Sequence, residues 1–305
     1  MEKVSCLGLP NCYRLTNGTV EVTVATDVGP RVLGYGFVGG ENVLGEAPEA
    51  AVTTAFGDWK PWGGHRLWAA PEVNPRSYVP DNAPVEFEFE GETKVRLIGP
   101  TETQTCVQKV VSVTLDSDGT GVTVRHRITN RGQWAVELSL WAMTILNCEG
   151  GGEVIIPQEP YRSWGHHVEP ARPLVLWHYT DLTDARLKLG RRFIRVRADD
   201  DAEDLLKIGA LNKQGWAAYL RGATLFVKRF PYEEGAIYPD YGCNTEAFTA
   251  RAFIQLESLS PVRRIEPGQT ASHEERWHLF RDFDAGATED SLEAALAGVL
   301  PRTEM

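Results

Sequence analysis

The stretch VVSVTLDSDGTGVTVRHRITNRG, residues 110–132, decides the fold class of this 305-residue chain. It contains two runs in which apolar and polar residues alternate, and alternation with a period of two is typical of a strand that buries one face. The dipeptide Asp118-Gly119 lies between the runs, and these residue types tolerate the positive φ angles of a tight turn. The stretch therefore predicts an antiparallel β-hairpin.

The same alternation recurs along the chain on both sides of this hairpin. A further hairpin is predicted around Arg221-Gly222, within residues 217–230. Many strands joined by short turns rich in glycine and proline indicate large antiparallel sheets packed as a sandwich, and such folds bind ligands on a concave face. The other alternating runs are residues 19–26, 84–99 and 194–198.

Helix signals are confined to two places. Residues 288–301 offer Thr288 as an N-cap, acidic residues in the first turn and Pro301 as a terminator, which predicts a short C-terminal helix. Residues 201–210, DAEDLLKIGA, predict a second short helix. Since no repeat or low-complexity linker divides the chain, we expect a single domain over residues 1–305.

The composition narrows the classes of partner. A formal net charge of −11 repels nucleic-acid backbones and anionic lipid, so a small, neutral ligand suits the chain better. The N-terminal segment lacks a long apolar stretch, and no run reaches the length of a membrane span, so we expect a cytoplasmic protein. Nothing in the sequence indicates an oligomeric state.

The metal-binding residue types do not form a recognisable site. The five cysteines are scattered and contain no C-x-x-C pair, which favours reduced, buried thiols over disulfides or zinc ligands. Residues 273–278, HEERWH, have one residue too many between the histidines for a zincin helix and lie in a segment that favours a strand. We therefore expect neither a metal nor an organic cofactor.

The chemically richest segment is PWGGHRLWAAPE, residues 61–72. Its paired glycines allow a tight turn that delivers His65 and Arg66 to a ligand, and indole rings beside them can stack on the C–H face of a sugar. The alternative is structural: Arg66 pairs with Glu72, and the tryptophans belong to the core. The tryptophans of this segment are Trp62 and Trp68.

Several segments, in order, resemble the galactose mutarotase-like proteins of the aldose 1-epimerase superfamily. The resemblance covers most of the chain up to the helix at Thr288, and it implies an all-β antiparallel supersandwich with a sugar site on its concave face. The segments are NGTVEVTVATDVGPRVLGYGFVGGENVL (17–44), GGHRLWAAPE (63–72), YVPDNAPVE (78–86), ITNRGQWAVELSLWAMT (128–144) and IQLESLSPVRRIEPGQ (254–269).

The resemblance also implies roles for particular residues. Glu257 stands where these epimerases carry the general base, and Arg66 resembles their substrate-orienting arginine. Trp141 falls where the acid histidine is expected, and an indole cannot protonate a ring oxygen. His65 is the first candidate to replace that acid, and Glu246, expected in a loop at the pocket rim, is the second.

These observations lead to a carbohydrate-binding, aldose 1-epimerase-like isomerase that interconverts sugar anomers by acid/base ring opening. The alternative is a non-catalytic sugar-binding or sensor protein on the same scaffold. A sugar-phosphate mutarotase would need a basic cluster, for which Arg66, Arg76 and Arg162 are available. Asp81 and Asn82 bind sugar hydroxyls or simply form a turn, and Trp62, Trp68 and Trp141 are candidate stacking surfaces.

Overall fold

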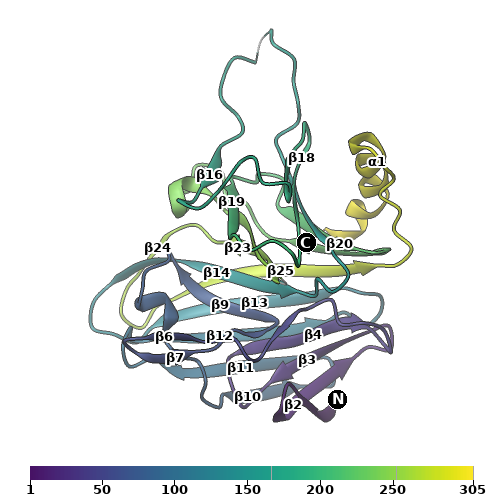
Figure 1. Cartoon of the computed structure of the whole chain (residues 1–305). Coiled ribbons are helices and arrows are strands. Elements are labelled where there is room, and N and C mark those ends of the chain that lie inside the picture. Colours follow the sequence, from purple (N-terminus) through teal and green to yellow (C-terminus); the bar gives the residue numbers. More distant parts are fainter. Residues whose placement is uncertain (166, 252, 305) are drawn as a thin grey trace.

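The computed structural model describes residues 1–165, 167–251 and 253–304, and it consists of two large antiparallel sheets packed face to face (Figure 1). The main hydrophobic core lies between the sheets and draws on both, for example Val22 and Leu140 from one and Val124 and Trp277 from the other. The predicted antiparallel sandwich is confirmed. Among the described residues, no helix has the length and apolar content needed to cross a membrane.

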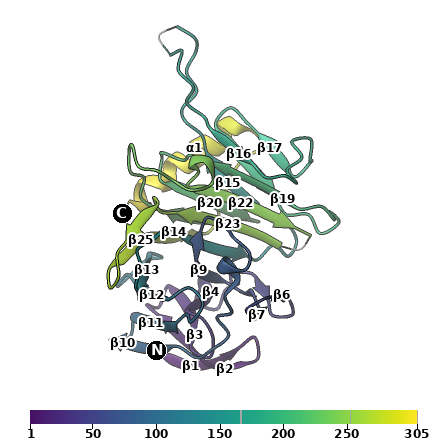
Figure 2. The ribbon, with the colours of Figure 1, turned by 90° about the vertical axis from the view of Figure 1, so that its left-hand side faces the viewer.

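The first sheet contains 11 strands and carries the site described below. Figure 2 shows its central strands β14, β23, β22 and β19 lying side by side. Its strands follow the order β1 (Glu2–Cys6), β2 (Leu9–Thr16), β3 (Val20–Ala25), β4 (Arg31–Phe37), β9 (His65–Ala70), β14 (Val136–Leu146), β23 (Phe253–Leu259), β22 (Thr245–Ala250), β19 (Leu206–Ala210) and β16 (Leu174–Leu176), with β24 (Arg263–Ile265) paired to β14.

The second sheet contains 10 strands and includes the hairpin from which the fold class was predicted, with Val113 opposite Val124. Its order is β10 (Glu86–Glu90), β11 (Lys94–Thr101), β12 (Val107–Leu115), β13 (Val122–Asn130), β25 (Thr270–Phe280), β21 (Thr224–Arg229), β20 (Trp216–Arg221), β15 (Glu153–Pro157), β18 (Phe193–Arg197) and β17 (Leu187–Leu189). Two small ribbons pair β5 (Glu46–Ala47) with β8 (Trp62–Gly63) and β6 (Val52–Thr54) with β7 (Gly57–Trp59).

The predicted C-terminal helix is confirmed, whereas the second predicted helix is wrong. Helix α1 (Glu289–Val299) begins after the N-cap Thr288, whose hydroxyl accepts from the Ser291 amide. Residues 206–210, by contrast, form the buried strand β19, because the sheet flanks them with β22 and β16 and supplies their backbone with hydrogen bonds. Short 3-10 turns complete the chain: η1 (Arg76–Tyr78), η2 (Asp240–Gly242) and η3 (Leu300–Thr303).

A chain of buried hydrogen bonds crosses the space between the sheets. The imidazole of His65 lies 2.8 Å from Thr144 Oγ1 through Nδ1 and 2.6 Å from His126 Nε2 through Nε2. His126 Nδ1 lies 3.1 Å from the carbonyl oxygen of His273 and must donate to it, since a carbonyl can only accept. His126 Nε2 therefore accepts from His65, and His65 Nδ1 accepts from the Thr144 hydroxyl.

This arrangement requires the histidines to be neutral. Burial lowers the pKa of His126 and of His273 to about 3, and it lowers the pKa of His65 well below its usual value. The nearby Lys228 ammonium, 2.6 Å from Thr144 Oγ1 and 2.9 Å from Glu275 Oε1, adds to the cost of a second positive charge. The sheets are thus held together by a network that is intact only while each of its histidines is neutral, with a single ring proton.

We expect the free energy of unfolding to fall as the pH decreases below about 6.5. The unfolded histidines take up protons from that pH downward, whereas folded His126 and His273 do so only near 3, so their contribution to stability is full above 6.5 and is lost toward acid. Urea unfolding at several pH values between 7.5 and 5 measures this slope. His126→Gln should flatten it and His178→Gln, at an exposed histidine, should not; equal slopes in both variants would contradict the account.

Candidate functional site

The outer face of the first sheet carries a row of chemically active side chains. Strand pairing places Arg66 of β9 opposite Met143 of β14, and Met143 opposite Glu257 of β23. Glu257 in turn lies opposite Glu246 of β22, which lies opposite Gly209 of β19. Directly opposed residues of antiparallel strands project to the same side, so this row forms one surface although its members are far apart in the sequence.

An aromatic wall stands beside this row. Trp68 and Trp141 are opposed on β9 and β14, with ring centroids 5.5 Å apart and nearly perpendicular planes. Trp59 of β7 packs edge-on against Trp68 at 4.9 Å, and Tyr78 of η1 contacts both rings. These aromatic rings form a small apolar cluster on this face with Met143, Leu259 and Ala70, separate from the core between the sheets.

Arg66 lies between two of these indoles without a polar partner. Its guanidinium carbon is 4.9 Å from the Trp59 ring centre and 5.0 Å from that of Trp68, and the residue is 2% exposed. Among the described residues it makes no hydrogen bond or ion pair, and its buried Nε and Nη1 atoms have no acceptor. Burial, assisted by the neighbouring Arg31, lowers the pKa of Arg66 to about 9.

Two buried carboxyl groups share one lysine in the middle of the face. The Lys207 ammonium lies 2.7 Å from Glu246 Oε2 and 3.1 Å from Glu257 Oε2, and the indole nitrogen of Trp141 donates to the same Glu257 oxygen at 2.9 Å. The other oxygen of Glu257, Oε1, is buried and has no partner among the described residues. The contacts at Oε2 thus fix the carboxyl group and leave Oε1 available.

Lys207 is itself enclosed by aromatic rings. Its ammonium lies 4.6 Å from the ring centres of both Trp141 and Trp177. Trp177 can approach because Gly209 has no side chain: a Cβ there would lie 3.3 Å from the Trp177 ring and 2.9 Å from the sulfur of Cys243. Burial opposes the charge of Lys207, but the carboxyl groups of Glu246 and Glu257 outweigh it and raise the lysine pKa.

The two carboxyl groups are not equivalent. Burial raises the pKa of Glu246 to about 8, with Glu257 adding to the shift and Lys207 opposing it. The thiol of Cys243 donates to Glu246 Oε1 at 3.1 Å. Burial therefore favours the protonated form of Glu246, which makes Glu246 the candidate acid beside the candidate base Glu257.

Most of the sequence-predicted site residues lie on this face. The structure brings together Arg66, Trp68, Trp141, Glu246 and Glu257. The expected loop position of Glu246 is wrong, because Thr245–Ala250 is a strand and Glu246 is fully buried directly opposite Glu257.

Four predicted residues lie elsewhere. His65 is adjacent to Arg66 in the chain but points to the opposite side of the strand, into the network between the sheets, so it is not placed to be the acid of this site. Trp62 packs on an N-terminal apolar cluster. Asp81 forms a 2.8 Å ion pair with Arg31, and Asn82 donates to the carbonyl of Asp58.

Several residues of the face were not predicted from the sequence. Lys207 was assigned to a helix, and the aromatic residues Trp59, Tyr78 and Trp177 occupy short or irregular segments without periodicity. Asp240 and Tyr241 adopt positive φ angles of 49° and 57° next to Cys243, a strained pair of the kind that gathers at functional sites. The sequence PDYGCNTE signals only a turn there.

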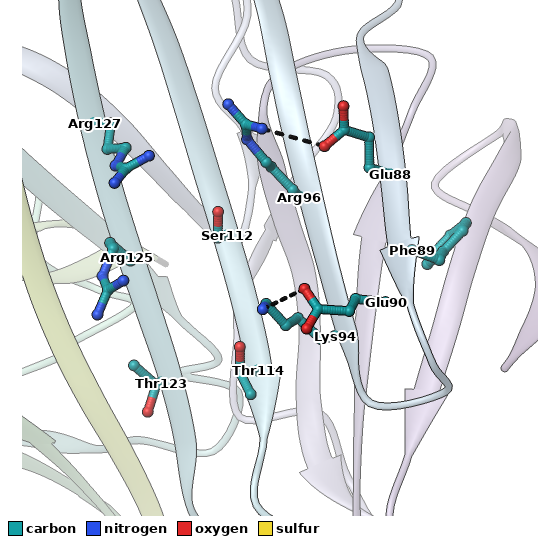
Figure 3. Close-up of a pocket in the computed structure, with 10 residues that line it drawn as sticks. All are labelled: Glu88, Phe89, Glu90, Lys94, Arg96, Ser112, Thr114, Thr123, Arg125 and Arg127. Carbon is teal, nitrogen blue, oxygen red and sulfur yellow. Dashed lines mark hydrogen bonds and ion pairs between the residues drawn. The ribbon is translucent and has the colours of Figure 1, made fainter. Parts of the chain in front are cut away.

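A different surface of the protein carries a shallow depression. It measures about 650 Å³ and lies on the outer face of the second sheet, over β10 to β13 (Figure 3). Its charges pair with each other in the open, as Arg96 does with Glu88 at 3.2 Å and Lys94 with Glu90. Exposed pairs of this kind are typical of a solvated sheet face.

Two groups of side chains have the composition of a metal site, namely His65, His126 and Glu275, and Asp240, Cys243 and Glu246. In the first, the two imidazole nitrogens are hydrogen-bonded to each other. In the second, Glu246 is already paired with the Lys207 ammonium. The absence of a metal, expected from the sequence, stays a prediction.

No protein-family model and no curated protein matches the chain. Solved structures do: a protein of Escherichia coli provisionally assigned as an aldose 1-epimerase matches with a TM-score of 0.57 and 11% identity over 89% of this chain and 99% of its own. A galactose mutarotase-like protein of Clostridium acetobutylicum matches with a TM-score of 0.55 and 12% identity over 92% of this chain and 98% of its own. The fold of this chain is therefore the galactose mutarotase-like sandwich, as predicted.

The same fold also forms part of a larger protein. A TPR-domain-containing protein of Parabacteroides distasonis matches with a TM-score of 0.58 and 12% identity over 96% of this chain but 55% of its own length. At identities this low, the likeness establishes the fold and leaves the chemistry to be argued from the side chains.

We expect Lys207→Met to lower the free energy of unfolding by about 3–5 kcal/mol, because it leaves two buried carboxyl groups facing each other without a cation. Urea unfolding at pH 7 measures the loss, with Lys213→Met, at an exposed lysine, as the control. Adding Glu246→Gln to Lys207→Met should recover part of the loss. A cost no larger than that of the control would show that Lys207 does not hold the carboxyl pair.

Proposed function

We propose that the protein binds a pyranose sugar on the outer face of the first sheet and interconverts its anomers. One observation carries the proposal: a guanidinium and a carboxyl oxygen, both buried and both without partners among the described residues, lie on one row beside an aromatic wall. Buried polar atoms without partners are costly, and a ligand that bonds to both groups would remove that cost.

A sugar can satisfy both the polar and the apolar parts of this surface. A hydroxyl group both donates and accepts, so it can give its hydrogen to Glu257 Oε1 while another oxygen accepts from Arg66. The apolar C–H face of the ring suits the indoles of Trp68 and Trp141. The structural neighbours whose names refer to galactose mutarotase or aldose 1-epimerase support the same class of ligand.

The carboxyl pair supplies both proton transfers of ring opening. Glu257 Oε1 takes the proton of the anomeric hydroxyl, and Glu246 gives its proton to the ring oxygen as the bond from that oxygen to the anomeric carbon breaks. The product is the open-chain aldehyde. Rotation of the aldehyde group and the reverse transfers close the ring with the hydroxyl on the other face, which returns both protons.

The positions of the two groups fit these roles. The anomeric hydroxyl and the ring oxygen are bonded to the same carbon, so acid and base must be close neighbours, as the directly opposed Glu246 and Glu257 are. Trp141 and Lys207 hold Glu257 Oε2 and thereby orient Oε1. Glu246 replaces His65 as the proposed acid.

A ligand must displace part of the cover to reach this surface, since Arg66, Glu246 and Glu257 are all buried. Trp177 is a half-buried member of the cover, and it follows β16, a strand of three residues at the edge of the sheet. We propose that movement of Trp177 admits the sugar. A cytoplasmic location and a role without a metal remain part of the proposal.

A non-catalytic sugar-binding protein is the second candidate. Trp141 favours it, because an indole stands where the resemblance places an acid histidine, and it donates to Glu257. Polarimetry on freshly dissolved α-sugars, beside a thermal-shift assay with the same sugars, separates the two: stabilisation without faster mutarotation selects the binding protein.

We expect Glu257→Gln to reduce the mutarotation rate by about 10²–10⁴-fold while sugar binding persists, because the amide keeps the shape but cannot take a proton. Polarimetry gives the rate and calorimetry the affinity. Glu274→Gln, at a carboxylate on the exposed face of the second sheet, is the matched control and should be neutral. Full activity of Glu257→Gln on a sugar that it binds would remove Glu257 from the mechanism.

The enzymatic rate should fall as the pH rises above about 8, because Glu246 then loses the proton that it must donate. Polarimetry between pH 6 and 9.5, with the spontaneous rate subtracted, gives the profile. Glu246→Gln should be slower throughout and lack this decline. A wild-type rate that keeps rising to pH 9.5 would assign the acid to another group.

A further inference from the structure

We propose that the sugar bound by this site carries a carboxylate, as a uronic acid does, and that Arg66 pairs with it. The inference rests on the proposed function, since it concerns the same surface. It goes beyond that function by specifying the charge of the ligand and the residue that binds the charged group.

The environment of Arg66 differs from that of every other deeply buried cation among the described residues. Each other lysine or arginine that is at least nine-tenths buried has a carboxylate partner within 4.0 Å, as expected for a charge removed from water. Arg66 has none, and the residue directly opposite it on β4 is a second arginine, Arg31, which is already paired with Asp81. The pairs are Arg31–Asp81, Lys109–Glu102, Arg186–Asp184, Lys207–Glu246, Lys207–Glu257 and Lys228–Glu275.

The indoles beside Arg66 hold it but do not neutralise it. Cation–π contacts at 4.9 and 5.0 Å stabilise the guanidinium through its faces and fix its plane. The N–H groups at its edge remain free, and a planar guanidinium edge matches a carboxylate. The missing partner is thus an anion that approaches the edge of the guanidinium, in the guanidinium plane.

The spacing of the row fits a ligand with its acid group and its anomeric centre attached on the two sides of the ring oxygen. Arg66 and Glu257 lie on strands separated by β14, so their backbones are about 10 Å apart. Both side chains lie on the same face of the sheet as Met143, which separates them by one strand. In a uronic acid the carboxylate is attached across the ring oxygen from the anomeric carbon.

The charge balance favours a carboxylate over a phosphate. Lys207 is paired with both Glu246 and Glu257, whereas the Arg66 guanidinium has no anion within 4.0 Å among the described residues. A singly charged carboxylate neutralises it, whereas a phosphate dianion leaves an excess negative charge in a buried site. The additional cations that a phosphate needs are engaged elsewhere, Arg76 with the carbonyl of Pro71 and Arg162 with His167.

Calorimetry on the wild-type protein tests this with pairs of sugars that differ only at the sixth carbon: galacturonate against galactose, and glucuronate against glucose. We expect one acidic sugar to bind about ten- to a hundredfold tighter than its neutral counterpart, the contribution of a hydrogen-bonded charge pair. Equal binding within both pairs overturns the inference but leaves the proposed function in place. Binding of none of the four, with no mutarotation, overturns both.

A substitution of Arg66 tests whether this residue causes the preference for acidic sugars. Arg66→Gln should bind acidic and neutral sugar with similar affinity, whereas Arg127→Gln, at an exposed arginine of the second sheet, should keep the wild-type preference. An acidic preference that persists in folded Arg66→Gln overturns the assignment, as does tighter binding of galactose 6-phosphate than of galacturonate to the wild type. Because the sugar pairs are compared on the wild type, the test does not depend on the variant folding.

Discussion

The site depends on the register of four antiparallel strands. Pairing of β9, β14, β23 and β22 sets Arg66, Met143, Glu257 and Glu246 in one line on the outer face. The same register sends the intervening residues, such as His65 and Thr144, into the space between the sheets. A shift of one residue in any strand would exchange these two sets, so the buried network and the site specify the same pairing.

Charged side chains are buried on both faces of the first sheet, but the two faces differ in how these side chains find hydrogen-bond and ion-pair partners. Between the sheets, each donor finds an acceptor through a chain of neutral histidines, and Lys228 pairs with Glu275. On the outer face, Lys207 satisfies one oxygen of Glu257 and leaves the other without a partner, while Arg66 has indole neighbours and no anion. The first arrangement is satisfied within the protein except at His273 Nδ1, which has no partner among the described residues, and it stabilises the fold. The second is completed only by a ligand, which is why we assign function to it.

The fold could be predicted from the sequence because period-two alternation and turn residues are local signals, as at residues 110–132. Arg66 was found from the composition of residues 61–72, whereas Glu257 and Trp141 were found through resemblance to a family. His65 was misplaced because residues 65–70 form a strand buried on both faces, so hydrophobicity does not reveal which side each residue takes. Lys207 was missed for a related reason: β19 is short and buried throughout, and such a run cannot be told from a helix by periodicity alone.

The central claim is that a bound sugar supplies the missing hydrogen-bond partners of Arg66 and Glu257. A crystal structure of the protein grown with galacturonate tests it most directly. The account predicts a ring above Met143, against the indoles of Trp68 and Trp141, with its anomeric hydroxyl within hydrogen-bonding distance of Glu257 Oε1 and an oxygen of the ligand bound by Arg66. Ligand density confined to another surface, with Arg66 paired to a side chain of the protein itself, would contradict it.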